Sequence, residues 1–321
     1  MDFSKVKMVI DDPGLLFLEL GHRGFFGWMS DERYLKAAYK VKMGRKPNLD
    51  HPVTYNEKLQ WLKLHDRNPM YINMVDKYEA GNVIGRIIGK EYIIPCLGVW
   101  DSFDEIPFSA LPDRFVLKCT HDSGGVAICT DKKSFDIRAA KRRIEKCLRS
   151  NYFNVGREWP YKYIKPRIIA EELIEDSASG DLRDYKFFTF NGEVKAVYVV
   201  SGRNTGGVTT ADFFSPDGTL LPIMNGHPNS EVPPELPAGF EKMKELASGV
   251  GKGIPHVRVD FYEANGRIWF GETTFYHWSG LMPFVPEEWD RTFGSWIKLP
   301  GEQESAGPEC AGSGETKEAL L

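Results

Sequence analysis

Apolar and polar residues alternate one by one from Val257 to Tyr262, and this alternation predicts a β-strand with one buried face. The dipeptide Asn265-Gly266 follows, which is a common sequence in tight hairpin turns. A second run, residues 267–273, would then return alongside the first strand. The whole stretch from His256 to Gly280 therefore predicts a β-hairpin followed by an aromatic loop.

The length of the turn decides which side chains of this hairpin share a face. A two-residue loop would send Glu272 to the face opposite Asp260, whereas a three-residue loop, Ala264-Asn265-Gly266, pairs Arg258 with Glu272. In the second case Arg258, Asp260 and Glu272 all lie on one face. We expect the three-residue loop, because it places the two carboxylates on diagonal neighbours within reach of one ion.

Two neighbouring carboxylates suit Mg²⁺, which usually binds one or two carboxylates together with substrate phosphates and water. The arginine beside them would stabilise negative charge that develops on a transferred phosphoryl group. The alternative interpretation is a structural hairpin whose charged side chains are solvated. The hairpin by itself leaves both interpretations open.

Helical patterns dominate residues 1–75. Between Asp31 and Lys46, Leu35 and Ala38 lie on one side and lysines and arginines cover the rest, which indicates a solvated basic face or a surface for an anionic glycan or a membrane. Thr54 followed three residues later by Glu57 predicts a capping box at the start of another helix.

From residue 76 the pattern changes to an apolar helix and then to short strands at residues 92–95, 115–119 and 126–130. Lys118 lies inside an apolar strand directly before the glycine loop Thr120–Gly125. Such a loop can fold over phosphates and donate backbone N–H groups to them. A buried lysine needs an anionic partner. The alternative is that its tip reaches solvent at the edge of the sheet.

The second half of the chain predicts further strands and two more helices. A basic amphipathic helix is expected from Ser134 to Ser150, a strand from Arg167 to Ile174, and a hairpin over residues 184–200 that turns at Asn191-Gly192. Residues 201–237 read as a long loop with one short hairpin, and a helix follows from Phe240 to Val250.

Composition limits the classes of function. The net charge of −4 over 321 residues gives no electrostatic argument for nucleic-acid binding. The five cysteines form no CxxC pair, which favours reduced thiols and a cytoplasmic protein. No basic signal peptide opens the chain, and no apolar run reaches the ~20 residues that a membrane span needs. We therefore expect no transmembrane segment, although peripheral membrane contact through the basic helix stays open.

Several of these segments, taken in order, resemble the ATP-grasp enzymes, and most closely the teichuronopeptide-type (TupA-like) branch. The resemblance extends from about Thr54 to Pro300. The segments that carry it are Asp76-Lys77-Tyr78, Phe115–Gly125, Ile169–Glu172, Asp184–Phe188, Arg258-Val259-Asp260 and Gly271–Phe275.

The resemblance implies an α+β fold in which two subdomains hold ATP between them. The expected division is a helical N-terminal segment at residues 1–75, a small subdomain with a glycine lid loop at 76–170, a large subdomain with the Mg²⁺-binding hairpin at 171–300, and a disordered tail at 301–321. The tail is polar, acidic and poor in aromatic residues, which agrees with disorder.

The resemblance also implies roles for individual residues. The residues expected to bind ATP are Lys77, Lys118, His121, Ser123, Gly124, Gly125, Glu171, Glu172 and Asp184. Those expected to bind Mg²⁺ are Asp260, Glu272 and Thr274, and those expected to act on the reacting groups are Arg258 and Lys186.

The implied activity is that of a carboxylate–amine ligase, which activates a carboxylate as an acyl phosphate before an amine attacks it. In this branch the implied context is bacterial surface or capsular polysaccharide synthesis, with a uronic acid or its sugar nucleotide as the carboxylate and an amino acid or amine as the partner. Residues 276–279 would line the acceptor site, with Trp278 stacking on a sugar. The alternative for these residues is a packed aromatic loop with a hydrogen-bonded His277.

Three other functions remain open at this stage. A kinase on the same scaffold would pass phosphate to a hydroxyl group. A capsule glycosyltransferase would need a D-x-D metal motif, which the chain lacks. A nucleotide-binding scaffold without turnover is suggested by three departures from the family pattern, at Gly81, Asp122 and Thr274.

Overall fold

The computed structural model describes residues 12–122, 124–176, 182–203 and 207–301. The predicted tail therefore lies outside the described residues except for Gly301. The helices are α2 (Pro13–His22), α3 (Asp31–Met43), α4 (Tyr55–His65), α5 (Met70–Val75), α6 (Lys77–Ile88), α7 (Ile137–Leu148), α8 (Phe153–Gly156), α9 (Phe240–Gly251) and α10 (Glu288–Trp296). The 3₁₀ helices are η1 (Lys90–Tyr92), η2 (Phe103–Glu105), η3 (Trp159–Tyr163) and η4 (His277–Gly280).

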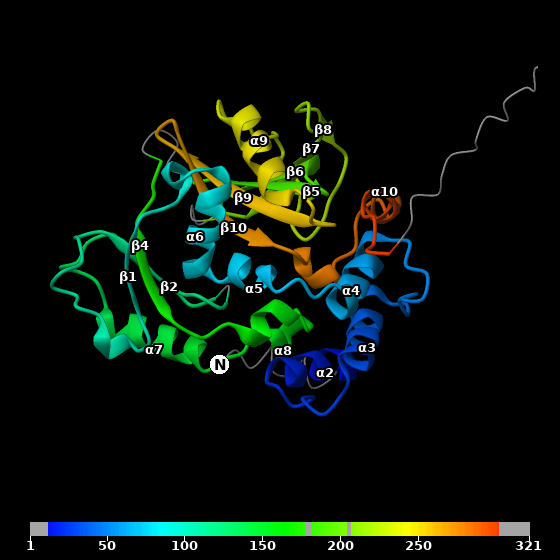
Figure 1. Ribbon diagram of the computed structural model, residues 1–321, viewed down its shortest axis with the longest axis horizontal. Coiled ribbons are helices and arrows are strands. Elements are labelled where there is room, and N and C mark those ends of the chain that lie inside the picture. Colours follow the sequence, from blue (N-terminus) through cyan, green and yellow to red (C-terminus); the bar gives the residue numbers. More distant parts are fainter. Residues whose placement is uncertain (1–11, 123, 177–181, 204–206, 302–321) are drawn as a thin grey trace, which may run out of the picture.

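Two antiparallel sheets form the body of the protein (Figure 1). The strands of the smaller sheet, in spatial order, are β1 (Cys96–Trp100), β4 (Ile168–Glu172), β2 (Phe115–Cys119) and β3 (Val126–Cys129). Those of the larger sheet are β10 (Arg267–Thr274), β9 (Val257–Ala264), β5 (Asp184–Phe190), β6 (Glu193–Ser201), β7 (Thr210–Phe214) and β8 (Leu220–Leu221). The chain passes from one sheet to the other between Glu172 and Asp184.

The N-terminal helices follow the sequence closely. Helix α3 buries Leu35 and Ala38, as its spacing predicts, and ends where Gly44 adopts a left-handed conformation with φ of 73°. The capping box is present at the start of α4: Thr54 accepts from the Glu57 N–H, and the Glu57 side chain accepts from the Thr54 N–H. Both ends are thus set by local hydrogen bonds that the sequence shows directly.

The structure differs from the sequence-based expectation in two places. The strand expected at residues 92–95 is wrong: η1 ends at Tyr92, and strand β1 begins only at Cys96. Pro95 has no N–H to donate to a ladder, so regular pairing starts after it. Within the predicted long loop, residues 210–214 form strand β7, which pairs with β6 at an outer position of the larger sheet.

Both faces of the larger sheet are covered, so every residue of β5 is buried. On one face Phe187 packs against Phe240 of α9, with ring centroids 5.7 Å apart. On the other face Phe188 packs against Phe293 of α10 at 5.6 Å. The same face continues along β5 to Lys186 and Asp184, so an apolar core and a buried polar cluster share one sheet face.

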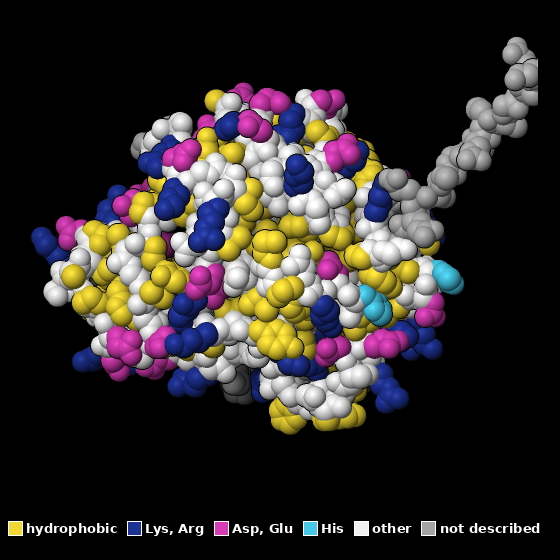
Figure 2. Space-filling model, in the orientation of Figure 1, with side chains coloured by type: hydrophobic (Ala, Val, Ile, Leu, Met, Phe, Trp, Pro, Cys, Tyr) yellow, Lys and Arg dark blue, Asp and Glu magenta, His cyan; other side chains and the backbone are white. Residues whose placement is uncertain are grey.

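The surface and the helices agree with the expectations from composition. In the face shown in Figure 2, acidic and basic side chains lie close to one another over much of the surface, with hydrophobic side chains between them. Across the described part of the chain, no helix has the length and apolarity to cross a membrane. The four cysteines in this part are all free thiols.

Candidate active site

The β9–β10 hairpin turns on two residues, not three. Ala264 pairs with Arg267, and the residues between them, Asn265 and Gly266, have φ values of 53° and 71°. Positive φ at both central positions is the signature of a tight two-residue turn. The predicted three-residue loop is therefore wrong.

A β-bulge at Gly271 nevertheless puts the two carboxylates on one face. Phe270 pairs with Phe261, but the next pair is Glu272 with Asp260, so Gly271 is an extra residue in β10. One extra residue reverses the alternation of side chains along the strand. Glu272 thus lies directly opposite Asp260.

Asp260 is the centre of a buried ionic cluster and only 1% exposed. Arg258 donates to both carboxylate oxygens, from Nε to Oδ1 and from a terminal nitrogen to Oδ2, each at 2.7 Å. Lys186, opposite on β5, also donates to Oδ2. Burial alone would raise the pKa of Asp260, but the two cations outweigh burial and lower it. Asp260 is therefore held as a carboxylate.

Arg258 also contacts the returning strand and the loop beyond it. Its terminal nitrogen lies 2.9 Å from Oγ1 of Thr274 and 3.3 Å from Oε1 of Glu272. A second terminal nitrogen donates to Nδ1 of His277 at 2.7 Å. These contacts fix the guanidinium plane against the sheet.

His277 is a hydrogen-bonded neutral ring. Because Nδ1 accepts from Arg258, the proton is on Nε2, which lies 3.0 Å from the Asn225 side-chain oxygen. Burial, followed by the charge of Arg258, lowers the pKa of His277 well below its usual value. Its role is to orient Arg258.

Asp184 lies at the end of the same face, beside Lys186. One of its oxygens pairs with Arg203 at 2.7 Å and with Lys186 at 3.5 Å. The other oxygen, Oδ1, is buried and has no hydrogen-bond partner among the described residues. A buried acceptor without a partner is costly, so this atom is suited to a ligand hydroxyl.

Lys118 and Lys77 face this cluster from the smaller sheet. Lys118 forms an ion pair with Glu171 on the neighbouring strand, which confirms that the lysine in this apolar strand has an anionic partner. Lys77, the first residue of α6, donates to the backbone carbonyl of Asp122 in the glycine loop. The two lysines therefore flank the loop on its inner side.

In the glycine loop, His121 does not face the site as expected for a residue that binds ATP. His121 is 2% exposed, and its Nε2 lies 3.1 Å from the carbonyls of Cys147 and Ser150, so the ring anchors the loop to the end of α7. The N–H of Gly125 donates to the Asp122 side chain at 3.0 Å. Asp122, one of the three departures from the family pattern, thus holds the loop together.

Of the remaining residues predicted to bind ATP, some lie at the site and others do not. Gly124 is in the loop with nothing within 4 Å of the position of a Cβ, whereas Ser123 lies outside the described residues. Glu172 ends β4 with an exposed side chain and does not line the space around Glu171. The structure therefore brings Lys77, Lys118 and Glu171 to the site, but not His121 or Glu172.

A cavity of about 740 Å³ lies between the two sheets. Its lining includes Lys77, Lys118, Asp184, Lys186, Arg258, Glu272 and Thr274, but not Asp260 or Glu171. It also contains residues that the sequence analysis missed. They are Tyr152, Glu158, Tyr161, Tyr198, Arg203, His227 and Tyr262. Tyr262 could have been found, because it lies two positions after Asp260 on the same strand face. Tyr198 lies on β6 opposite Lys186, in a register set by a bulge in the β5–β6 hairpin. The others come from loops and segments that no spacing connects.

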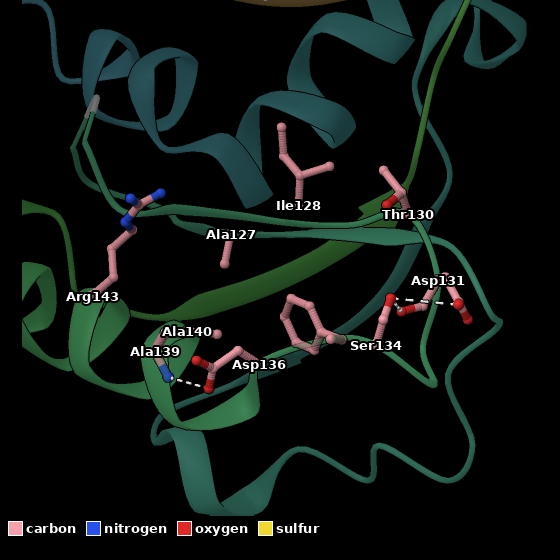
Figure 3. Close-up of a pocket in the computed structure, with 10 residues that line it drawn as sticks. Ala127, Ile128, Thr130, Asp131, Ser134, Asp136, Ala139, Ala140 and Arg143 are labelled. Atoms are coloured by element: carbon pink, nitrogen blue, oxygen red, sulfur yellow. Dashed lines mark hydrogen bonds between the residues drawn. The ribbon is translucent and has the colours of Figure 1, made fainter.

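A second hollow, of about 320 Å³, lies between β3 and α7 (Figure 3). It is lined by Ile128, Asp131, Asp136 and Arg143 among others, and none of the described site residues faces it. Asp136 there caps α7 by accepting from the Ala139 N–H at 2.9 Å. This hollow is separate from the chemistry between the sheets.

The donor set fits one divalent cation in part. The side chain of Glu272 is 42% exposed and lines the cavity, and among the described residues only its Oε1 forms hydrogen bonds, which leaves Oε2 available as a ligand. Asp260 lies opposite, although its oxygens already accept from two cations. No three acidic, histidine or cysteine side chains in the described chain form a complete metal site. Phosphate and water oxygens would have to complete the shell, as is usual for Mg²⁺.

Comparison with known proteins identifies a family. The family described as TupA-like ATPgrasp matches residues 57–298. No curated protein matches the chain. Among solved structures, the D-alanine–D-alanine ligase from Bacillus anthracis complexed with ATP has 16% identity and a TM-score of 0.39, with 63% of this chain and 55% of that chain covered.

Two further structures are similar at the same level. The D-alanine–D-alanine ligase from Helicobacter pylori has 12% identity and a TM-score of 0.41, covering 76% of this chain and 69% of that one. The ATP-grasp ligase PsnB complexed with minimal precursor, Mg and ADP has 9% identity and a TM-score of 0.35, covering 76% and 59%. The chain spans just over half the length of the Bacillus anthracis enzyme. The match to the family over residues 57–298 shows that the chain belongs to the TupA-like ATP-grasp family.

Proposed function

We propose that this protein is an ATP-dependent carboxylate–amine ligase that works through an acyl phosphate. One observation carries the proposal: Arg258 and Glu272 of the β9–β10 hairpin line a cavity of about 740 Å³ together with Lys118, and Asp260 lies buried beside them on the same hairpin face. Cations on both sides of a cavity that also holds two carboxylates suit a metal-bound polyphosphate.

We propose a place for each part of ATP from the residues present. The phosphates would lie between Lys118 and Lys77 on one side and Glu272, which pairs with Asp260, on the other. Asp184 would accept from the ribose hydroxyls through Oδ1, its unpartnered oxygen. The base would enter the narrow recess beside Glu171, which is lined by Ile93, Ile94 and Phe270 among other residues.

The protein's own groups would then control the transfer. Mg²⁺, when bound by Asp260 and Glu272, supplies charge neutralisation to the phosphates. Arg258, held in place by Asp260 and His277, would orient the substrate carboxylate and stabilise the charge on the phosphoryl group. Lys186, which Asp260 and Asp184 flank, would add a second cation at the same point.

For the substrates, we propose a uronic acid or its sugar nucleotide as the carboxylate, joined to an amino acid or amine in bacterial surface or capsular polysaccharide synthesis. Trp278 supports a sugar: its side chain is 40% exposed, lines the cavity and contacts the His227 ring with centroids 5.5 Å apart. An aromatic face with one open side suits stacking on a sugar ring.

The test is a screen for ADP release with uronic acids and amines supplied separately and together. A ligase releases ADP and phosphate only when both are present. Phosphate retained on a hydroxyl acceptor would instead identify a kinase, and ATP binding without ADP release would identify a scaffold. Product mass separates an amide from a phosphate ester.

A further inference from the structure

The loop after β10 adopts a strained conformation that the protein holds in place. Trp278, Ser279 and Gly280 have φ values of 48°, 57° and 61°, and the first two are not glycine. Left-handed non-glycine residues are costly and concentrate at functional sites. Because this turn lines the cavity between the sheets, its conformation calls for a functional explanation.

Two residues of α4 hold the turn from behind. Gln60 donates to the carbonyls of Ser279 and Gly280 at 3.0 and 2.8 Å. Lys63, only 1% exposed, donates to the carbonyl and the hydroxyl of Ser279 at 2.7 and 2.9 Å and to the Gln60 side chain at 3.1 Å. These three bonds use all the donors of the Lys63 ammonium group.

Glu158 lies against this turn and faces the cavity. It is 5% exposed, and no ion pair among the described residues includes it. The backbone approaches closely here, since a Cβ on Gly156 would lie 1.8 Å from the Ser279 hydroxyl oxygen. Lys63 influences Glu158 through its charge, but its donors are directed at Ser279. Glu158 is therefore a buried carboxyl group without a direct cation.

We propose that Glu158, positioned by Ser279 and Lys63, is the site that binds the ammonium group of the acceptor and removes its proton. This inference rests on the proposed ligase function. A buried carboxylate attracts a cation most strongly when no protein cation contacts it. The other cations at the cavity, Lys77, Lys118, Lys186, Arg203 and Arg258, line the region assigned to the phosphates and the carboxylate.

The chemical step balances with the groups present. An ammonium ion first gives one proton to the Glu158 carboxylate and becomes a neutral amine. The amine nitrogen then forms a bond to the acyl carbon while the bond from that carbon to the phosphate oxygen breaks. Phosphate leaves with the electron pair and takes up the second proton from the nitrogen as the amide forms.

The surroundings of Glu158 make it a stronger proton acceptor than an exposed carboxylate. Burial raises its pKa above the usual value, and Lys63, Ser279 and Arg258 oppose this rise in part. Burial lowers the pKa of Lys63 to about 8. The other titratable groups that face Glu158 are Tyr161 and Tyr276, whose pKa values are raised by their own burial and then by Glu158.

The first test measures binding, so that it does not depend on turnover. Ethylammonium chloride is titrated by calorimetry into the full-length protein with Mg²⁺ and a non-hydrolysable ATP analogue. Glu158→Gln should weaken ethylammonium binding at least tenfold and leave binding of the analogue within twofold. Glu241→Gln, an exposed glutamate on α9, should change neither.

The outcomes separate this inference from the proposed function. Failure of the wild type to bind the ATP analogue would overturn the ligase assignment. Binding of the analogue without ethylammonium binding, or with equal ethylammonium affinity in wild type and Glu158→Gln, would overturn the role of Glu158 alone.

A second variant guards against a purely structural effect. Glu158→Asp keeps the charge, and amine binding should fall as the pH is lowered through the pKa of that carboxyl group. In Glu158→Gln this fall should disappear. A Glu158→Gln protein that melts like the wild type but keeps the same pH profile of amine binding would contradict the inference.

Discussion

At the scale of single residues, the site depends on charges that are buried and compensated. Asp260 has two cationic partners and Asp184 has two, so the cluster loses water on folding but keeps its charges paired. Such a cluster is expensive to break, because removing one member leaves the others buried without a partner. Its members are therefore poor candidates for silent substitution.

Replacing Asp260 with Asn should destabilise the fold as well as stop the reaction. Arg258 and Lys186 would lose their common acceptor, which should lower the free energy of unfolding by about 3 kcal/mol in urea titrations at pH 7. Asp113→Asn, on an exposed turn, serves as the control. An Asp260→Asn protein with unchanged stability would show that the cluster contributes no net energy.

The contribution of Asp260 depends on pH in a defined direction. Its pKa is lowered in the folded protein, so its stabilisation is complete above about pH 4, where the unfolded carboxyl group ionises. The stabilisation is lost as the pH falls through the lowered pKa.

Lys118 is expected to bind phosphate after releasing Glu171. Lys118→Ala should weaken ATP binding by about 1.5–3 kcal/mol, because a charge-assisted contact is lost, while the melting temperature stays close to that of the wild type. Lys133→Ala, exposed on the same subdomain, should bind ATP normally. Equal ATP affinity of Lys118→Ala and wild type in calorimetry would refute the assignment.

At the scale of elements, the β9–β10 hairpin places its acids through the bulge and not through the turn. With a regular ladder after the Asn265-Gly266 turn, Glu272 would pair with Val259 and point into the core behind the sheet. The extra residue at Gly271 avoids this, and it also lets Thr273 face inwards and donate to the Met74 carbonyl at 2.6 Å. The buried side chains of both strands therefore favour the bulged register.

If the bulge sets the face of Glu272, deleting Gly271 should do less damage than replacing it with valine. Deleting it would make the ladder regular while keeping Glu272 opposite Asp260. Gly271→Val keeps the chain length, but its Cβ would lie 3.0 Å from the Tyr262 ring and 3.2 Å from the Asp260 carbonyl, which should cost about 1–3 kcal/mol. We expect the deletion to retain more stability and more Mg²⁺-dependent ATP binding than Gly271→Val. The reverse order would show that the bulge does not set the face of Glu272.

At the scale of the whole molecule, the candidate site is formed by side chains from several elements that meet between the two sheets. The smaller sheet supplies Lys118, α6 supplies Lys77, the larger sheet supplies Asp184 and Glu272, and the connection between α8 and η3, before β4, supplies Glu158. Helices α4 and α10 support the same sheet face at its other end. Disturbing that support should therefore affect the site at a distance.

A buried neutral histidine, His256, lies where α4 packs on the larger sheet and should make the stability of the protein sensitive to acid. His256 donates from Nδ1 to the Thr189 carbonyl and accepts from the Tyr55 hydroxyl, both at 2.9 Å, and burial lowers its pKa to about 3. The unfolded ring takes up a proton below about pH 6.5 and the folded ring does not, so stability is complete above that pH and falls below it.

The expected loss is about 1.4 kcal/mol per pH unit for such a ring. The free energy of unfolding is measured by urea titration at pH 7.5 and at pH 5.5. Its decrease between these two pH values should be about 1.4 kcal/mol smaller in His256→Gln than in the wild type. His51→Gln, at an exposed position, should match the wild type. An identical pH difference in all three proteins would contradict a neutral buried His256.

The sequence by itself determined the features that depend on neighbours along the chain. Caps, turns and strand alternation are set by hydrogen bonds and side-chain directions within a few residues, so the capping box at Thr54, the Asn191-Gly192 hairpin and the helix from Phe240 could be predicted. The ordered motifs also indicated the family, and the shared face of Asp184 with Lys186 followed from strand periodicity.

The tertiary structure decided what depends on distant contacts. The bulge at Gly271 is chosen by which side chains the two packed faces can bury, and a two-residue turn alone gives no sign of it. His121 was separated from the site because the carbonyls at the end of α7 bind its ring. Glu158 and Arg203 joined the site only because folding brings their loops to one cavity. Local pattern specifies an element and its faces, whereas the partner of each buried charge is specified by packing between elements remote in sequence.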